Sequence, residues 1–311
     1  MTDRSSESTD YDVVIVGGGP AGCAAGVFTA RYGLETAVFD RGAAPLRRCA
    51  HLENYLGFPA GIDIDSFYDL IHAQVEEAGC DLVADTVDTV DRGDDTERFV
   101  VDPQDAASVT ATVVVAATWY DGEYLRPLGG DAMFETHDHD GEEHEHFDPA
   151  YADADGRTPI DGLYVASPAG QRSTQAVVAA GHGAHVGRCV LADRRREEGY
   201  PDGVAEHYDW LRRDAEFSGE WNDRDRWRDW FDDEAGEDHG LSDERYERLR
   251  ERYIDRAFET RVSETSADER SRRGLGRLLE TIGTDRVLDA IDDETIEAYV
   301  RRRRSGETGT D

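Results

Sequence analysis

The stretch that decides the fold is DVVIVGGGPAG, which runs from Asp12 to Gly22. Its valines and isoleucine form a short apolar run that is typical of a buried strand in a parallel sheet. Glycines then follow at Gly17, Gly19 and Gly22, and small residues predict a helix that continues to Tyr32. In this spacing the first glycine permits a tight turn, the second lets the backbone approach a pyrophosphate, and the third lets the helix pack against the strand. The stretch therefore predicts the start of a dinucleotide-binding βαβ unit.

A second strand and an acid complete this unit. Residues 35–40, ETAVFD, predict a strand that ends at Asp40, and an acid about 20 residues after the glycines can accept hydrogen bonds from ribose hydroxyls. A glycine-rich turn without a ligand is the alternative. We predict cofactor contacts from the glycine turn, the acid and its neighbour: Gly17, Gly18, Gly19, Pro20, Ala21, Gly22, Asp40 and Arg41.

Strand and helix patterns alternate along the rest of the first 195 residues. The further predicted elements are a helix over 62–78, antiparallel strands over 82–90 and 99–101, buried strands over 113–117 and 163–166, and a helix over 174–191. This order predicts an α/β fold class, a Rossmann-like domain over 11–195 with a parallel sheet and a small antiparallel sheet. An all-α region over 196–305 follows, with tails at 1–10 and 306–311.

The charge of the chain restricts its partners and its setting. The formal net charge is -35, from 69 acidic and 34 basic residues, and the sequence contains no lysine. Such acidity resembles that of haloarchaeal proteins, in which molar salt screens the repulsion. It disfavours nucleic acid and anionic membranes as partners. No apolar run reaches the roughly 18 residues of a membrane span, and the polar start of the chain is not a signal peptide. We expect a cytoplasmic protein.

Four further segments resemble thioredoxin reductases and their flavoprotein relatives. Residues 51–62, HLENYLGFPAGI, are similar to a segment that wraps the flavin in that family. Residues 113–118, VVVAAT, and 162–166, GLYVA, are similar to two of its strands, and 171–176, QRSTQA, to the start of a helix that points at the flavin ring. The resemblance implies FAD as the cofactor. It also implies cofactor contacts from Asn54, Thr118, Gln175 and Ala176, although Asn54 could equally be a turn residue.

Three departures from the family change the expected function. Only residues 118–162 separate the strands at 113–117 and 163–166, where the family inserts a nicotinamide-binding domain of roughly 100 residues. The sequence has no CxxC pair, which a disulfide relay needs. Trp119 replaces a glycine of the family, and Ser167-Pro168 stands where the family has an aspartate. We expect a FAD-binding oxidoreductase with an external electron donor and acceptor, and not a thioredoxin reductase with its own dithiol. A non-catalytic nucleotide-binding regulatory protein is the alternative.

The histidines and one cysteine raise further hypotheses. His137, His139, His144 and His146 lie in an acidic insert over 126–160 and could bind a transition metal. We favour a solvated acidic loop and no metal. His182 and His185 are interpreted as helix packing residues near the site. Cys49 follows Arg47 and Arg48, two cations that would favour a reactive thiolate, although an ordinary loop cysteine is the preferred interpretation.

The C-terminal third contains four of the five tryptophans. Tyr246, Leu249 and Tyr253 recur at helical spacing, as do apolar residues further on. We interpret this pattern as a helical core or a homodimer interface. A cap over an apolar ligand such as a quinone is the alternative.

Overall fold

The structure is a computed structural model that describes residues 9–93, 98–139, 142–170, 174–236 and 239–305. The chain forms two compact units, Met1–Val262 and Ser263–Asp311. Most of the two predicted tails and the quoted residues 171–173 lie outside the described residues.

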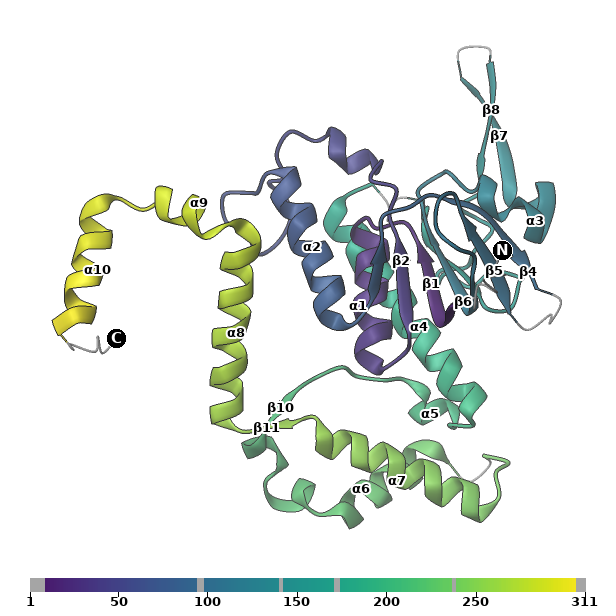
Figure 1. Ribbon diagram of the computed structural model, residues 1–311. Coiled ribbons are helices and arrows are strands. Elements are labelled where there is room, and N and C mark those ends of the chain that lie inside the picture. Colours follow the sequence, from purple (N-terminus) through teal and green to yellow (C-terminus); the bar gives the residue numbers. More distant parts are fainter. Residues whose placement is uncertain (1–8, 94–97, 140–141, 171–173, 237–238, 306–311) are drawn as a thin grey trace, which may run out of the picture. The chain divides into compact units, whose positions relative to one another are not determined.

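A mixed sheet forms the centre of the first unit (Figure 1). Its order is β3-β2-β1-β6-β5-β4, and β9 pairs with β6 beside β5. The pairs β1–β2, β2–β3, β1–β6 and β6–β9 are parallel, and the pairs β4–β5 and β5–β6 are antiparallel. The strand bounds are β1 Thr9–Val16, β2 Thr36–Phe39, β3 Asp81–Val83, β4 Val87–Arg92, β5 Phe99–Pro103, β6 Val109–Ala117 and β9 Leu163–Ser167. The predicted fold class is therefore confirmed.

Both faces of the parallel part of the sheet are buried. Val13 and Ile15 of β1 pack with helices α1 (Pro20–Tyr32), α2 (Ile64–Ala78) and α4 (Ala176–Glu198). Val14 and Val16 face the other way, into a cluster with side chains from β4, β5 and the segment 118–162. Burial on both faces is the physical reason for the continuous apolar run of β1.

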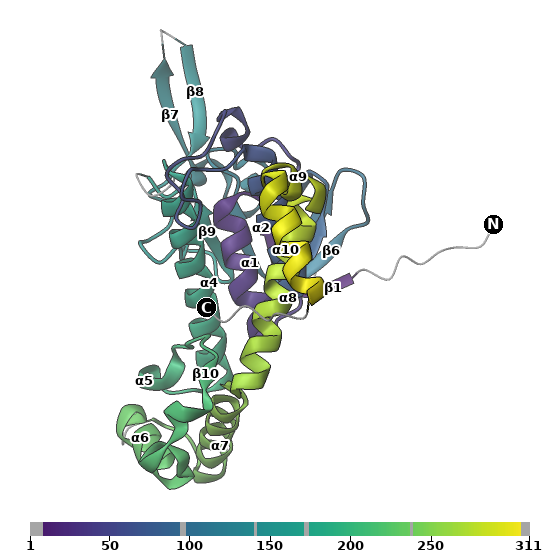
Figure 2. The ribbon, with the colours of Figure 1, turned by 90° about the vertical axis from the view of Figure 1, so that its left-hand side faces the viewer.

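Helices α1 and α4 lie side by side (Figure 2). Gly183 of α4 faces the backbone of α1 so closely that an added Cβ would lie 2.0 Å from the carbonyl oxygen of Ala21. Gly187 makes a similar approach to Ala25. The small residues of α4 therefore allow close packing on α1, and α4 extends seven residues beyond the predicted end at Leu191.

The predicted strand over 82–90 is two strands, β3 and β4. The break falls at Asp85, whose carboxylate accepts hydrogen bonds from the backbone amides of Thr86, Asp105 and Ala106. These bonds hold the pKa of Asp85 below its usual range, because they favour the charged form. They replace strand pairing at the point where the chain leaves the parallel sheet for the antiparallel pair β4–β5.

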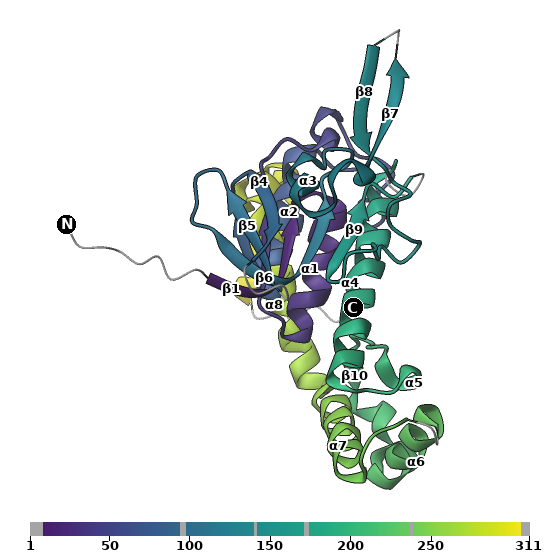
Figure 3. The ribbon, with the colours of Figure 1, turned by 90° about the vertical axis from the view of Figure 1, so that its right-hand side faces the viewer.

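The insert is more ordered than a solvated loop. Its short helices η2 (Glu123–Leu125), α3 (Arg126–Gly129) and η3 (Gly130–Met133) lead into a hairpin of β7 (Phe134–His139) and β8 (Glu142–Phe147). Met133 and Phe147 at the base of this hairpin are fully buried in the core. Figure 3 shows the hairpin extending from the α/β part of the unit.

The remaining part of the first unit is helical apart from one short parallel strand pair, β10 (Arg212–Arg213) with β11 (Arg261–Val262). Its helices are α5 Asp202–Ala205, α6 Arg224–Ala235 and α7 Asp243–Glu259. Trp227 and Phe231 are buried among other aromatic residues, so this part of the aromatic pattern is a core.

The second unit consists of α8 (Glu264–Ile282), α9 (Thr284–Asp289) and α10 (Asp293–Ser305). None of its described residues is buried. Among the described residues of the whole chain, no helix has both the length and the apolar character of a membrane span.

Candidate functional site

A cavity of about 330 Å³ lies where β1, β2 and β6 end and where α1 and α4 begin. The carboxyl ends of parallel strands are the usual ligand site of such sheets. Nine of the predicted contact residues line it, namely Gly17, Gly18, Gly19, Pro20, Ala21, Asp40, Arg41, Thr118 and Ala176. Gly22, Asn54 and Gln175 are not in the lining.

The three motif glycines occupy different surroundings. Gly17 has a φ of +117°, and a Cβ there would lie 2.3 Å from the carbonyl oxygen of Ala117. A Cβ on Gly22 would lie 1.9 Å from the carbonyl oxygen of Gly17. Gly19 has no atom within 4 Å of its Cβ position, so the open space beside it belongs to the cavity. The first and third glycines are thus required by the fold, and the second leaves room for a ligand.

Asp40 is held by a histidine that sequence reasoning missed. His72 of α2 places its Nε2 3.4 Å from Oδ2 of Asp40 and 2.9 Å from the carbonyl oxygen of Gly18. The other carboxylate oxygen of Asp40 accepts a hydrogen bond of 3.0 Å from the amide of Gly42. The glycine turn and the acid are therefore fixed relative to each other by a side chain with no motif signal.

Tyr68 of α2 also lines the cavity and was not predicted. The side chain is 2% exposed, and its hydroxyl has no hydrogen-bond partner in the described part of the chain. Burial raises the pKa of Tyr68 to about 12, although Arg47, above the ring, opposes the shift. The neutral hydroxyl can donate one hydrogen bond. A buried hydroxyl without a partner is costly, and because this oxygen is itself fully buried, it does not open into the cavity that the ring lines.

Asn54 and Gln175 meet beside the cavity, although 121 residues separate them. Nδ2 of Asn54 donates a hydrogen bond of 2.7 Å to Oε1 of Gln175. Gln175 is the residue before α4, and Ala176 starts that helix and lines the cavity. The two segments chosen by resemblance are thus brought together at the start of α4.

The family departures lie in the lining as well. Trp119 has a φ of +61°, in the left-handed region that favours glycine. Trp119 therefore adopts, at a steric cost, a backbone conformation that glycine adopts freely. Thr118 donates a hydrogen bond to the carbonyl oxygen of Asp121, and Ser167 is a buried part of the wall.

Two helix N-termini meet at the cavity. Pro20 and Ala21 begin α1 and Ala176 begins α4, and all three are in the lining. The first amides of a helix lack intrahelical partners and carry the positive end of its dipole. The site can therefore attract an anionic group although the chain has a formal net charge of -35.

Cys49 lies in the wall of the cavity, partly buried, and its thiol donates a hydrogen bond of 3.2 Å to the carbonyl oxygen of His51. Burial raises the pKa of Cys80 to about 12 and that of Cys23 further still. Cys49 is therefore a better candidate for a reactive thiol than Cys23 or Cys80.

The predicted histidine cluster lies on the β7–β8 hairpin. His137 is directly opposite His144, and its ring centroid is 6.0 Å from that of His146. Nε2 of His137 also lies 2.9 Å from a carboxylate oxygen of Glu135. The side chain of His139 lies outside the described residues. A metal at this place stays a hypothesis.

The sheet order and the glycine turn define an α/β protein with a Rossmann-like fold. Residues 11–147 match the family described as pyridine nucleotide-disulphide oxidoreductase. The chain is 32% identical over 123 residues to a thioredoxin reductase from Pneumocystis carinii, and this match covers 37% of each chain. It is 33% identical over 121 residues to a thioredoxin reductase from Streptomyces clavuligerus, which covers 38% of this chain and 36% of that protein.

Among solved structures, a thioredoxin reductase from Gloeobacter violaceus shares the fold, with a TM-score of 0.51 and 19% identity. The match covers 66% of this chain and 100% of that chain. Residues 11–147 of this chain are thus similar to the pyridine nucleotide-disulphide oxidoreductase family and to thioredoxin reductases. Its sequence match spans under two fifths of the length of the first two relatives.

Proposed function

We propose that the cavity binds FAD noncovalently and that the protein passes electrons through this cofactor. The observation that carries the proposal is the cavity itself, which is enclosed by the glycine turn, Asp40 and two helix N-termini. Its open space at Gly19 fits a ligand that approaches the glycine turn closely.

Each part of the wall suits a different part of that ligand. The backbone N–H groups of Gly18, Gly19 and Ala21 at the start of α1 would bind the pyrophosphate, and Asp40 would accept hydrogen bonds from a ribose. Gln175 and Ala176 at the start of α4 would lie toward the flavin ring, where a positive helix end stabilises negative charge. When bound, FAD supplies the redox chemistry, and the protein orients it and sets its electrostatic environment.

The electron donor and acceptor are proposed to come from outside the chain. The sequence contains no CxxC pair. The described residues of 118–162 form short helices and a hairpin, part of which packs into the core. This segment is too short for the roughly 100 residues of a further nucleotide-binding domain.

A second function, nucleotide binding without catalysis, has its own support. Trp119 and Ser167 stand in the wall at positions where the family has glycine and aspartate. These two changes favour a regulatory protein that keeps the fold and binds a nucleotide with altered contacts around the ring.

The visible spectrum of the protein, purified in molar salt, tests the first proposal. We expect a flavin spectrum with about one FAD per chain, or reconstitution by added FAD. Gly19→Val should abolish binding, because a side chain would fill the space beside the turn. Gly181→Val is the matched control, since Gly181 also has no atom within 4 Å of its Cβ position and lies outside the cavity wall.

A colourless protein that does not take up FAD would refute the proposal. Equal flavin content in the Gly19→Val and Gly181→Val variants would refute the placement. If flavin is bound, anaerobic addition of NADH or NADPH separates the two functions. Slow or absent bleaching of the flavin by these nucleotides, together with bleaching by a partner reductase, supports an external donor. A flavin that no donor reduces supports the non-catalytic function.

The setting is also a proposal. We infer that the protein works in the cytoplasm at molar salt, because its acidic charge would repel itself in dilute buffer. Exposed apolar residues of α8, among them Leu275 and Leu278, are consistent with a homodimer.

A further inference from the structure

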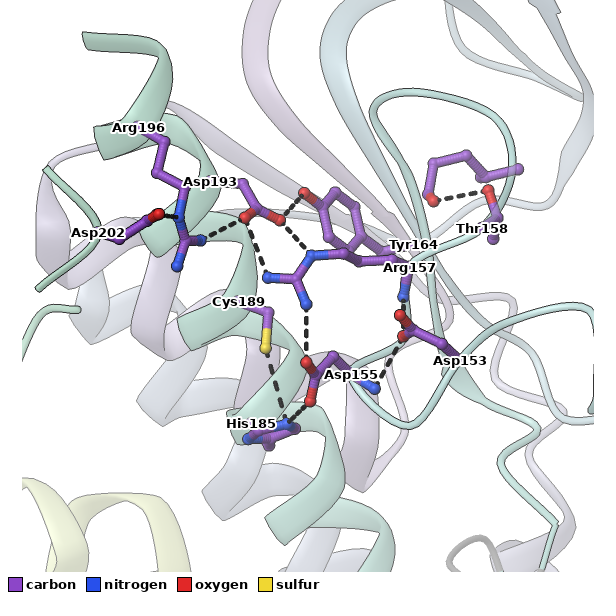
Figure 4. A network of polar contacts seen from close by, with 11 residues as sticks. Asp153, Asp155, Arg157, Thr158, Tyr164, His185, Cys189, Asp193, Arg196 and Asp202 are labelled. Atoms are coloured by element: carbon purple, nitrogen blue, oxygen red, sulfur yellow. Dashed lines mark hydrogen bonds and ion pairs between the residues drawn. The ribbon is translucent and has the colours of Figure 1, made fainter. Parts of the chain in front are cut away.

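Asp155, His185 and Cys189 form a compact group of metal-binding side chains, which we call the Asp–His–Cys cluster (Figure 4). Their ligand atoms all lie within 4.8 Å of one another. Nε2 of His185 is 2.7 Å from Oδ1 of Asp155 and 3.6 Å from Sγ of Cys189. None of the three residues lines the FAD cavity.

The nitrogen-to-sulfur distance suits a tetrahedral ion, whereas the 2.7 Å between His185 and Asp155 is a hydrogen bond that would open when an ion binds. Zinc bonds of about 2.1 Å to nitrogen and 2.3 Å to sulfur, at a tetrahedral angle, place the two ligand atoms about 3.6 Å apart. A nucleophile, base and acid relay needs both ring nitrogens of the histidine. Here the carboxylate and the thiol both face Nε2, so the three ligand atoms converge on one point.

The elements that carry the cluster hold its geometry. His185 and Cys189 are one turn apart in α4, so their side chains share a face of the helix. Asp155 lies in the connection between β8 and β9, where Asp153 accepts hydrogen bonds of 2.9 Å from the amides of Asp155 and Arg157. The ligands therefore come from two independently ordered segments.

A second layer of contacts orients the carboxylate. Oδ2 of Asp155, the oxygen that does not face His185, lies 2.8 Å from Nη1 of Arg157. Arg157 is itself paired with both oxygens of Asp193, at 2.6 and 3.0 Å. Asp193 thus offsets the charge of the arginine, and Oδ1 of Asp155 stays directed at the cluster. Such outer contacts are typical of metal sites.

We propose that Asp155, His185 and Cys189 bind a divalent transition-metal ion of the zinc type, with a fourth position left to water. One thiolate, one imidazole and one carboxylate are ligands that zinc accepts. Zinc binds cysteine as the thiolate, so binding would release the thiol proton of Cys189. The ion would fasten the β8–β9 connection to α4.

The structure also revises the interpretation of His185 as a packing residue. Its side chain is 46% exposed, as is that of Asp155, whereas Cys189 is buried. An ion could therefore reach the cluster from solvent. Neighbouring His182 is buried and stacks on His185 at 6.3 Å, which fits the packing role predicted for it.

Titration of the metal-free full chain with Co²⁺, without oxygen, tests the proposal. We expect the visible bands of tetrahedral cobalt, together with a sulfur-to-cobalt absorption in the near ultraviolet, both saturating at one ion per chain. Zn²⁺ should bleach both. Cys189→Ser should lose the sulfur absorption, and Cys49→Ser, the matched control, should keep it, because Cys49 is a partly buried thiol outside the cluster.

Cobalt bound without a sulfur absorption would overturn the proposal, because carboxylates or the hairpin histidines would then hold it. A sulfur absorption that survives Cys189→Ser would overturn it as well. If that variant does not fold, His185→Ala decides: because His185 is half-exposed, it should fold and lose the tetrahedral bands, and unchanged bands would count against the cluster. Every readout is independent of FAD.

Discussion

Replacement of Tyr68 by phenylalanine should stabilise the FAD-free protein and leave FAD binding unchanged. The Tyr68 hydroxyl is buried and without a partner among the described residues. An unpaired buried polar group costs about 1–3 kcal/mol. Removing it while the ring keeps its packing should raise the free energy of unfolding of the FAD-free protein by about 1 kcal/mol.

The same change should leave the Kd for FAD unchanged, because the buried hydroxyl does not open into the cavity. Loss of one hydrogen bond to the ligand, worth about 1 kcal/mol, would instead raise that Kd roughly fivefold. Denaturant unfolding of the FAD-free protein in molar salt measures the first effect. Titration with FAD, followed by flavin fluorescence, measures the second.

Tyr11→Phe is the matched control, because the hydroxyl of Tyr11 already donates a hydrogen bond of 2.8 Å to Asp81. That variant should lose about 1 kcal/mol of stability with or without FAD, and its FAD affinity should not change. A Tyr68→Phe protein that is less stable than the wild type, or that binds FAD about fivefold more weakly, would refute the description of this hydroxyl as buried and unpaired.

Three further predictions concern the fold around the site. Gly22→Ala should lower the free energy of unfolding by about 3 kcal/mol, the upper end of overpacking costs, since its Cβ would lie 1.9 Å from the carbonyl oxygen of Gly17; a stable variant in denaturant unfolding would contradict the packing role. Trp119→Gly should be about 1 kcal/mol more stable than Trp119→Ala, because only alanine keeps a Cβ at a φ of +61°; equal thermal midpoints would exclude backbone strain there. Burial lowers the pKa of His207 in the folded protein to about 4. As the pH falls below about 6.5, the histidine of the unfolded chain therefore takes up a proton before that of the folded chain, and the free energy of unfolding decreases between about pH 6.5 and pH 4. His207→Phe, which keeps a ring against Tyr32, should reduce that fall in unfolding curves at pH 7 and pH 5, and an identical pH dependence would rule His207 out as its source.

The sequence was most informative where the residues that determine a structural feature lie within one short segment. The turn from Gly17 to Gly22 requires glycine because β1, α1 and β6 meet there within a few ångströms, and this requirement is written in consecutive residues. The placement of Asp40 at the end of β2 follows in the same way. The predicted fold class is confirmed for this reason, although the strand over 82–90 is divided at Asp85, where side-chain bonds to three amides end the pairing.

The insert shows where sequence reasoning stopped. Its histidines and acids predict a solvated loop, and composition alone hides the two apolar anchors at its base. Met133 and Phe147 become core residues because β6 exposes an apolar face that the 118–162 segment covers. That face is a property of the sheet, so the local sequence does not reveal it.

By itself, then, the sequence determined the βαβ unit, the succession of strands and helices along residues 11–195 and the likeness to flavoproteins, because these depend on contiguous patterns of apolar residues and glycines. The tertiary structure alone decided that His72 holds Asp40, that Tyr68 has a hydroxyl without a partner in the wall, and that Asp155 meets His185 and Cys189. Each of these contacts joins residues from separate elements. Their distance in space depends on how α2 and α4 pack on the sheet, and spacing along the chain carries no record of it.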